Sequence, residues 1–135
     1  MLNPIFTQDL RKMINENTKK LEGIQNYSSE EQVIGTWFGK KLYRKTFYRG
    51  VLINGNTETI NHGIYNVDKI WLDPSHSFAI WPSGMTNNLP FLNVEGIDNS
   101  IGVYDLSATS FKLKSGLSRA NLSGYITLEY TKNAD

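Results

Sequence analysis

The spacing of apolar positions divides the chain into two parts. The first part, residues 3–23, has its only proline, Pro4, at the position where a helix begins, and Asn3 before it is a suitable N-cap. Gly23 stands where such a helix would end. Between these residues the chain contains no other glycine or proline. The pattern therefore predicts a helix over residues 3–23.

Five residues in and just after this helix recur at the alternating intervals that define a heptad seam. They are Leu10, Ile14, Asn17, Leu21 and Ile24. This seam packs either on the β domain of its own chain or on the same seam of other copies, as a short parallel bundle. In the bundle, Asn17 would form a polar layer that sets the register. About two heptads are fewer than a coiled-coil prediction normally requires, so both arrangements stay open.

From Gln32 onward the pattern changes to short runs rich in Val, Ile, Tyr, Phe and Trp, separated by Gly, Asn, Ser and Thr. Many short strands with frequent turn signals favour a β-sandwich or a jelly-roll-like barrel. The predicted organisation is an N-terminal helical stalk over residues 1–26 and a β-sandwich head over residues 27–135. The predicted strands cover residues 32–38, 41–48, 57–61, 68–73, 77–82, 90–94, 100–105, 109–114 and 123–131.

Composition narrows the classes of function. A chain of 135 residues with 39% hydrophobic content has room for one core. It contains no cysteine, so a disulfide framework and a thiolate metal site are excluded. No run reaches the roughly 18 apolar residues of a membrane-spanning helix, so we expect no membrane insertion. The net charge of +1 is too small to predict a nucleic-acid partner.

Catalytic chemistry is poorly supported by the residue pattern. His62 lies in an Asn-His-Gly turn, and His76 lies in Asp-Pro-Ser-His-Ser. The second run contains the residue types of a hydrolytic triad, but a triad converges from separate segments rather than from one loop. The acidic residues are scattered, and Asp98-Asn99 lacks the alternating acidic spacing of a calcium loop. We therefore expect no enzyme, no cofactor and no metal.

Residues 40–49, KKLYRKTFYR, alternate cations and aromatic rings. Such a strand can bind single-stranded nucleic acid by stacking and charge. Alternation puts Tyr43 and Phe47 on one face and Tyr48 on the other. We favour a strand with one face at the edge of the core, whose long cationic stems cover apolar surface. Trp37 and Tyr43, on either side of the Phe38-Gly39 turn, are expected to pin this first hairpin against the core.

Trp81 is followed by a loop that is polar and rich in amides. Alternation groups Phe78 with Ile80 as the core face of the preceding strand, so Trp81 is expected on the more exposed face. An indole stacks on a pyranose ring, and amides bond to hydroxyls. An ordinary exposed loop is the alternative. The candidate glycan-binding residues are Trp81, Asn87 and Asn88.

Residues 27–46, YSSEEQVIGTWFGKKLYRKT, resemble the opening of a β-rich module at the distal end of bacteriophage tail and fibre proteins. That family pattern runs roughly Tyr-Ser-x-x-Glu-x-x-x-Gly-Thr-Trp, a short turn, then Tyr-x-Lys-Thr. The family usually has Asp-Gly in the turn, where this chain has only Phe38-Gly39, so we expect a turn one residue shorter. The matching residues are Tyr27, Ser28, Glu31, Gly35, Thr36, Trp37, Gly39, Tyr43, Arg44, Lys45 and Thr46. Later pieces that also fit are His62-Gly63-Ile64 with Asn66-Val67-Asp68, Ile101-Gly102-Val103-Tyr104, and the closing GYITLEYTK of residues 124–132.

The resemblance implies a non-enzymatic, homotrimeric part of a virion fibre or tail tip. Its head would attach to the host surface, including through a surface glycan, and its N-terminal segment would join other virion proteins. Its location would be the virion, assembled in the host cytoplasm. The alternative is a structural head-fibre, decoration or connector protein that binds another virion protein and has no host ligand.

Overall fold

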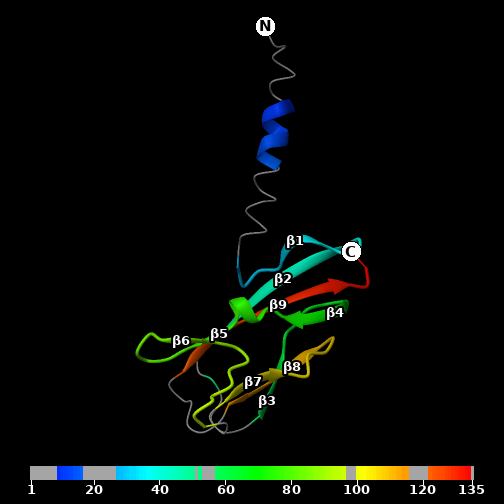
Figure 1. Cartoon of the computed structure of the whole chain (residues 1–135). Coiled ribbons are helices and arrows are strands. Elements are labelled where there is room, and N and C mark those ends of the chain that lie inside the picture. Colours follow the sequence, from blue (N-terminus) through cyan, green and yellow to red (C-terminus); the bar gives the residue numbers. More distant parts are fainter. Residues whose placement is uncertain are drawn as a thin grey trace.

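A computed structural model of the chain describes residues 9–16, 27–50, 52, 57–96, 100–115 and 122–134. Within these residues the protein is mainly β, with one short N-terminal helix over residues 9–16 (Figure 1). The rest of the predicted helix, including Asn17, Leu21 and Ile24, lies outside the described residues. The strands are β1 Gln32–Trp37, β2 Lys40–Arg49, β3 Thr57–Asn61, β4 Val67–Leu72, β5 Phe78–Ile80, β6 Thr86–Asn88, β7 Ile101–Tyr104, β8 Ser110–Ser115 and β9 Ser123–Lys132, with a 3-10 turn, η1, at Pro74–His76.

Most of the predicted strands are present, with two differences. The strand predicted over residues 90–94 is wrong, because there only Phe91 forms an isolated bridge, to Ile101. The Asn93 side chain accepts a hydrogen bond from the backbone N–H of Glu95, and this Asx turn bends the chain away from a strand. Conversely, β6 forms in a segment predicted as loop, because its backbone pairs with β5 despite the weak strand propensity of Thr-Asn-Asn.

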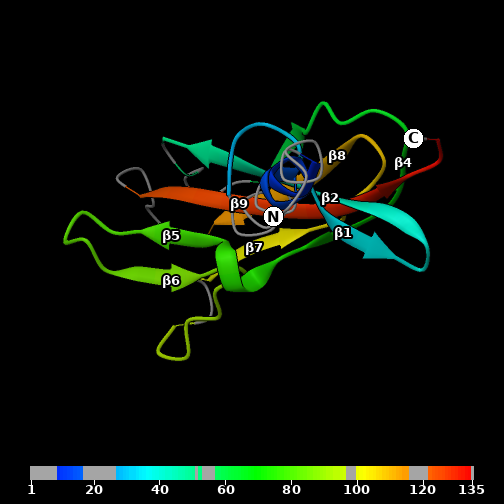
Figure 2. The ribbon, with the colours of Figure 1, turned by 90° about the horizontal axis from the view of Figure 1, so that it is seen from above.

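The strands form two antiparallel sheets (Figures 1 and 2). Sheet A has the order β1-β2-β9-β5-β6, and sheet B has the order β3-β8-β7. In sheet A, β4 also pairs with β9, so β4 and β5 follow one another along the same edge of that long strand. The η1 turn lies between them. There the buried Ser77 hydroxyl accepts a hydrogen bond from the Thr127 N–H at 2.9 Å and donates to the Asp73 carbonyl at 2.7 Å.

Apolar residues of both sheets gather in one core. The rings of Phe47 in β2 and Phe111 in β8 lie with centroids 6.4 Å apart, which links the two sheets. Tyr43 belongs to this core and Phe47, on the same face of β2, packs against it. The buried apolar residues are Tyr43, Leu52, Ile64, Val67, Ala79, Leu89, Ile101, Val103, Phe111, Leu113, Leu122, Ile126, Leu128 and Tyr130.

The first hairpin turns through two residues, Phe38 and Gly39, with φ of 47° and 80°. Positive φ at both positions is typical of the type I′ turn that suits a two-residue hairpin. The expectation that Trp37 is buried is wrong, since it is 43% exposed. Its strand lies at the edge of sheet A, and its ring lies on that of Trp71, 4.9 Å between centroids, rather than in the core.

The helix extends from the side of the head formed by β1 and β2, away from sheet B (Figure 1). All of residues 9–16 are exposed, including the apolar Leu10, Met13 and Ile14 at 44%, 59% and 54%. This part of the seam therefore does not pack on the β domain of its own chain. In the described part of the chain, no helix has the length and hydrophobicity that crossing a membrane requires.

Candidate functional site

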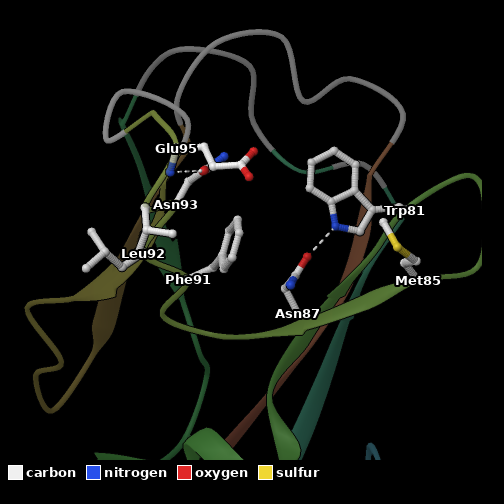
Figure 3. A pocket seen from close by; sticks show the side chains of 8 residues that line it. Trp81, Met85, Asn87, Phe91, Leu92, Asn93 and Glu95 are labelled. Carbon is white, nitrogen blue, oxygen red and sulfur yellow. Dashed lines mark hydrogen bonds between the residues drawn. The ribbon is translucent and has the colours of Figure 1, made fainter.

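A cavity of about 330 Å³ opens beside Trp81 (Figure 3). Its walls come from three segments: the end of β5, strand β6, and the loop that follows β6. The volume is at the lower end of the roughly 300–1,000 Å³ of small-molecule sites. The lining residues are Trp81, Met85, Asn87, Phe91, Leu92, Asn93, Val94 and Glu95.

Trp81 reaches this cavity from the core side of β5. The expectation that Phe78 and Ile80 form the core face is wrong, because Ala79 is fully buried while its two neighbours are only partly buried. The register explains the difference. Phe78 pairs with Tyr125 and packs on its ring, whereas Ala79 pairs with Gly124. The expectation that Trp81 lies on the more exposed face is also wrong, because Trp81 is partly buried and packs against the core while it lines the cavity.

Asn87 and Asn88 have different environments because they are consecutive residues of a strand. Successive side chains of a strand point to opposite faces. Asn87 lines the cavity, and its Oδ1 accepts a hydrogen bond from the Trp81 indole N–H at 2.5 Å. Asn88 does not line the cavity, and its Nδ2 donates to the Pro74 carbonyl at 2.8 Å. The structure thus brings Trp81 and Asn87 together and directs Asn88 to η1.

The two amides of the cavity have assigned orientations. The Asn93 Oδ1 accepts from the backbone N–H of Glu95 at 3.0 Å, as the Asn87 Oδ1 accepts from the indole (Figure 3). Both donors are N–H groups that cannot accept, so the oxygen end of each amide is determined. The Nδ2 group of each Asn is therefore the end that remains to donate hydrogen bonds to a ligand.

Glu95 also lines the cavity, and it carries the only charge among the lining residues that the structure describes. Figure 3 shows the Glu95 carboxylate extending between the ring of Phe91 and the indole of Trp81. Two aromatic rings, two amides and one carboxylate thus surround one small space. The sequence pattern did not identify Phe91, Asn93 and Glu95 as site residues. Their loop reaches the cavity through the bridge between Phe91 and Ile101, which is a tertiary contact.

The residues that open the fibre-like motif, residues 27–31, have structural roles. The Tyr27 ring lies between the His76 ring, at 4.2 Å, and the Arg44 guanidinium, at 4.1 Å. Glu31 accepts a hydrogen bond from the Tyr130 hydroxyl at 2.6 Å and pairs with Lys132 at 2.9 Å. These contacts attach the segment that follows the helical part to β2, η1 and β9.

Both histidines are engaged in local contacts. His62 is buried, its Nδ1 accepts from the Ile64 N–H, and its Nε2 donates to the Ser107 carbonyl. His76 Nδ1 contacts an Asp73 carboxylate oxygen at 2.9 Å. No serine hydroxyl of the described residues hydrogen-bonds to His76, so a serine–histidine–aspartate relay does not form here. The same residues contain no group of three or more His, Asp or Glu able to hold a metal ion.

Comparisons with protein-family models, with curated proteins and with solved structures gave no match to this chain. The resemblance to phage appendage modules is therefore carried by its motif residues alone.

Proposed function

We propose that this protein is a non-enzymatic module of a phage fibre or tail tip, and that the cavity beside Trp81 attaches it to carbohydrate on the host surface. The observation that carries the proposal is the composition of that cavity. A pyranose offers apolar C–H faces and a rim of hydroxyls. Two aromatic side chains, Trp81 and Phe91, match the faces, and the oriented amides of Asn87 and Asn93 match the hydroxyls.

The proposed head is a β-sandwich of sheets A and B, and the proposed assembly is a homotrimer held by its N-terminal helices. The shared core and the contact of Phe47 with Phe111 support the sandwich. The exposed apolar residues Leu10, Met13 and Ile14 support a helical bundle, since packing on two neighbouring copies would bury them. The heptad positions Asn17, Leu21 and Ile24 would continue this seam.

The position of the cavity suits a receptor-binding tip. One of its walls, the loop after β6, pairs through Phe91 with β7 of sheet B, on the side of the head away from the helix (Figure 1). A stalk attached to the virion would thus present the cavity outward. Single sites that bind one sugar are weak, and three copies on one trimer would raise avidity through effective concentration.

Adsorption of the protein to host cells tests this function. Asn87→Asp keeps an oxygen for the Trp81 indole and removes both amide donors, so adsorption should fall about tenfold, the equivalent of roughly 1.4 kcal/mol. The matched control is Asn61→Asp, which makes the same change at an exposed residue of β3 outside the cavity and should adsorb like the parent. Equal adsorption of all three proteins would refute the cavity as the receptor site.

Light scattering tests the assembly. The full chain should behave as a trimer at micromolar concentration, and a Leu10→Asp, Ile14→Asp double variant should dissociate. Circular dichroism should show that the double variant keeps its β structure, because both residues are exposed in the single chain. A monomeric parent protein would contradict the trimer.

The alternative function, a decoration or connector protein that binds another virion protein, is favoured by a different surface. At the tip of the first hairpin Trp37 is 43% and Phe38 92% exposed. Exposed aromatic side chains of this kind are common in protein interfaces. If a Phe38→Asn variant loses a complex with a capsid or tail protein while Asn87→Asp retains it, the connector function replaces the glycan function.

A further inference from the structure

The charge of the cavity beside Trp81 indicates which class of sugar it binds. This inference rests on the proposed function. We propose that the cavity accepts hexopyranose units without an acidic group and rejects sugars that carry a carboxylate, phosphate or sulfate. Glu95 is the residue that determines this specificity.

The hydrogen-bonding groups of the cavity suit sugar hydroxyls. The Nδ2 groups of Asn87 and Asn93 are donors, because their oxygens already accept from the indole and from a backbone N–H. The Glu95 carboxylate is an acceptor only. A sugar hydroxyl both donates and accepts, so one hydroxyl can bond to an amide and a neighbouring hydroxyl to Glu95. An ionised acidic group has no proton for Glu95.

The described residues that line the cavity include no cation to compensate the charge of Glu95. Among the lining residues that the structure describes, Glu95 is the only charged one, so none of these eight pairs with a ligand anion. Two like charges about 6 Å apart, at an effective dielectric constant of about 40, repel enough to weaken binding roughly tenfold. The neutral residues Met85, Leu92 and Val94 supply apolar wall instead.

The shape of the cavity suits a single sugar residue. A cavity of about 330 Å³ with aromatic rings on two sides holds a terminal sugar residue rather than a long chain. Trp81 is held by its hydrogen bond to Asn87 and by the core behind it, so its ring needs little ordering on binding. The Trp81 wall of the site is therefore in place before the ligand arrives.

The test uses the full chain and pairs of immobilised oligosaccharides that differ only at C6 of the terminal residue. Each pair compares a hexose with its hexuronic acid, for the gluco, galacto and manno series. At an ionic strength of about 0.01 M, where screening is weak, at least one hexose should bind about tenfold more tightly than its uronic acid. Glu95→Gln preserves the shape of the side chain and should bring the ratio close to one while retaining hexose binding.

The matched control is Glu30→Gln, which removes an exposed carboxylate of the segment before β1 and should leave the ratio unchanged. If the parent protein binds a uronic acid as well as its hexose, or if Glu95→Gln does not change the ratio, the charge selection is overturned and the glycan function stands. If the parent protein binds no sugar of either kind, the proposed function itself fails, and this inference fails with it.

Discussion

Replacing Tyr130 with Phe removes a single hydroxyl from β9. The Tyr130 ring is fully buried and stacks on the Tyr43 ring with centroids 5.6 Å apart, and the variant keeps this packing. The hydroxyl donates to Glu31 Oε1 at 2.6 Å. This short, charge-assisted hydrogen bond is the interaction that the variant loses.

The expected loss of unfolding free energy is about 1.5 kcal/mol. Hydrogen bonds to charged groups are worth about 1.5–3 kcal/mol. The lower value applies because the Glu31 side chain is 36% exposed, so water can replace part of the interaction. Glu31 also keeps its ion pair with Lys132 at 2.9 Å.

The loss of unfolding free energy should depend on pH. The pKa of Glu31 determines whether the loss grows or shrinks as the pH falls. Burial alone would raise that pKa, but hydrogen bonds from Tyr130 and Lys132 hold it below the usual 4.5. A carboxyl group with a lowered folded-state pKa stabilises the fold above its unfolded-state pKa and loses this contribution as pH falls through the folded-state value. The difference between parent and variant should therefore be largest near pH 7 and shrink below about pH 4.5. Burial, followed by the neighbouring Glu31, raises the pKa of Tyr130, so its hydroxyl stays protonated and donates throughout this range.

Urea unfolding at pH 7 and at pH 3, at one protein concentration, measures both effects. Tyr125→Phe is the matched control, because it removes a hydroxyl from the same strand at a residue that is 36% exposed. It should change stability by less than about 0.5 kcal/mol. A Tyr130→Phe variant as stable as the parent at pH 7, or equally destabilised at both pH values, would refute this account of the Glu31 site.

Three further substitutions test packing and backbone conformation. Ser77→Ala leaves a buried backbone N–H of β9 without its acceptor and should cost about 1–3 kcal/mol in urea unfolding, whereas Ser75→Ala at an exposed position should cost little. A Cβ on Gly124 would lie 3.1 Å from a carbonyl oxygen of β5, so Gly124→Ala should lower the unfolding free energy by about 1–3 kcal/mol. The control Gly102→Ala, whose Cβ would have its nearest contact at 3.5 Å, should lower it less. Equal losses in the two variants would contradict the close approach. Phe38→Asn should stabilise the hairpin by about 0.5–1 kcal/mol, read as a higher melting temperature, because Asn tolerates the φ of 47° better than Phe; a lower melting temperature would show that the exposed ring contributes to the fold.

The sequence predicted only some of the residues that line the candidate site. Trp81 and Asn87 were identifiable because a ring followed by amides is a local feature of the chain. Phe91, Asn93 and Glu95 carry no such local signal, and their loop joins the cavity through the bridge from Phe91 to Ile101. The loop prediction also treated Asn87 and Asn88 alike, whereas pairing of β6 with β5 sends them to opposite faces.

The sequence by itself determined the mainly β character of residues 32–132, the position of most strands and the two-residue first turn. These are local properties, set by the two-residue period of a strand and by the backbone conformations that Gly permits. The tertiary structure decided which face of each strand is buried. Ala79 faces the core in place of Phe78 because its register against Gly124 of β9 puts it there, and Trp37 stays exposed because it lies on an edge strand. Such choices depend on which strands become neighbours, and the residues that determine those neighbours lie tens of positions apart in the chain.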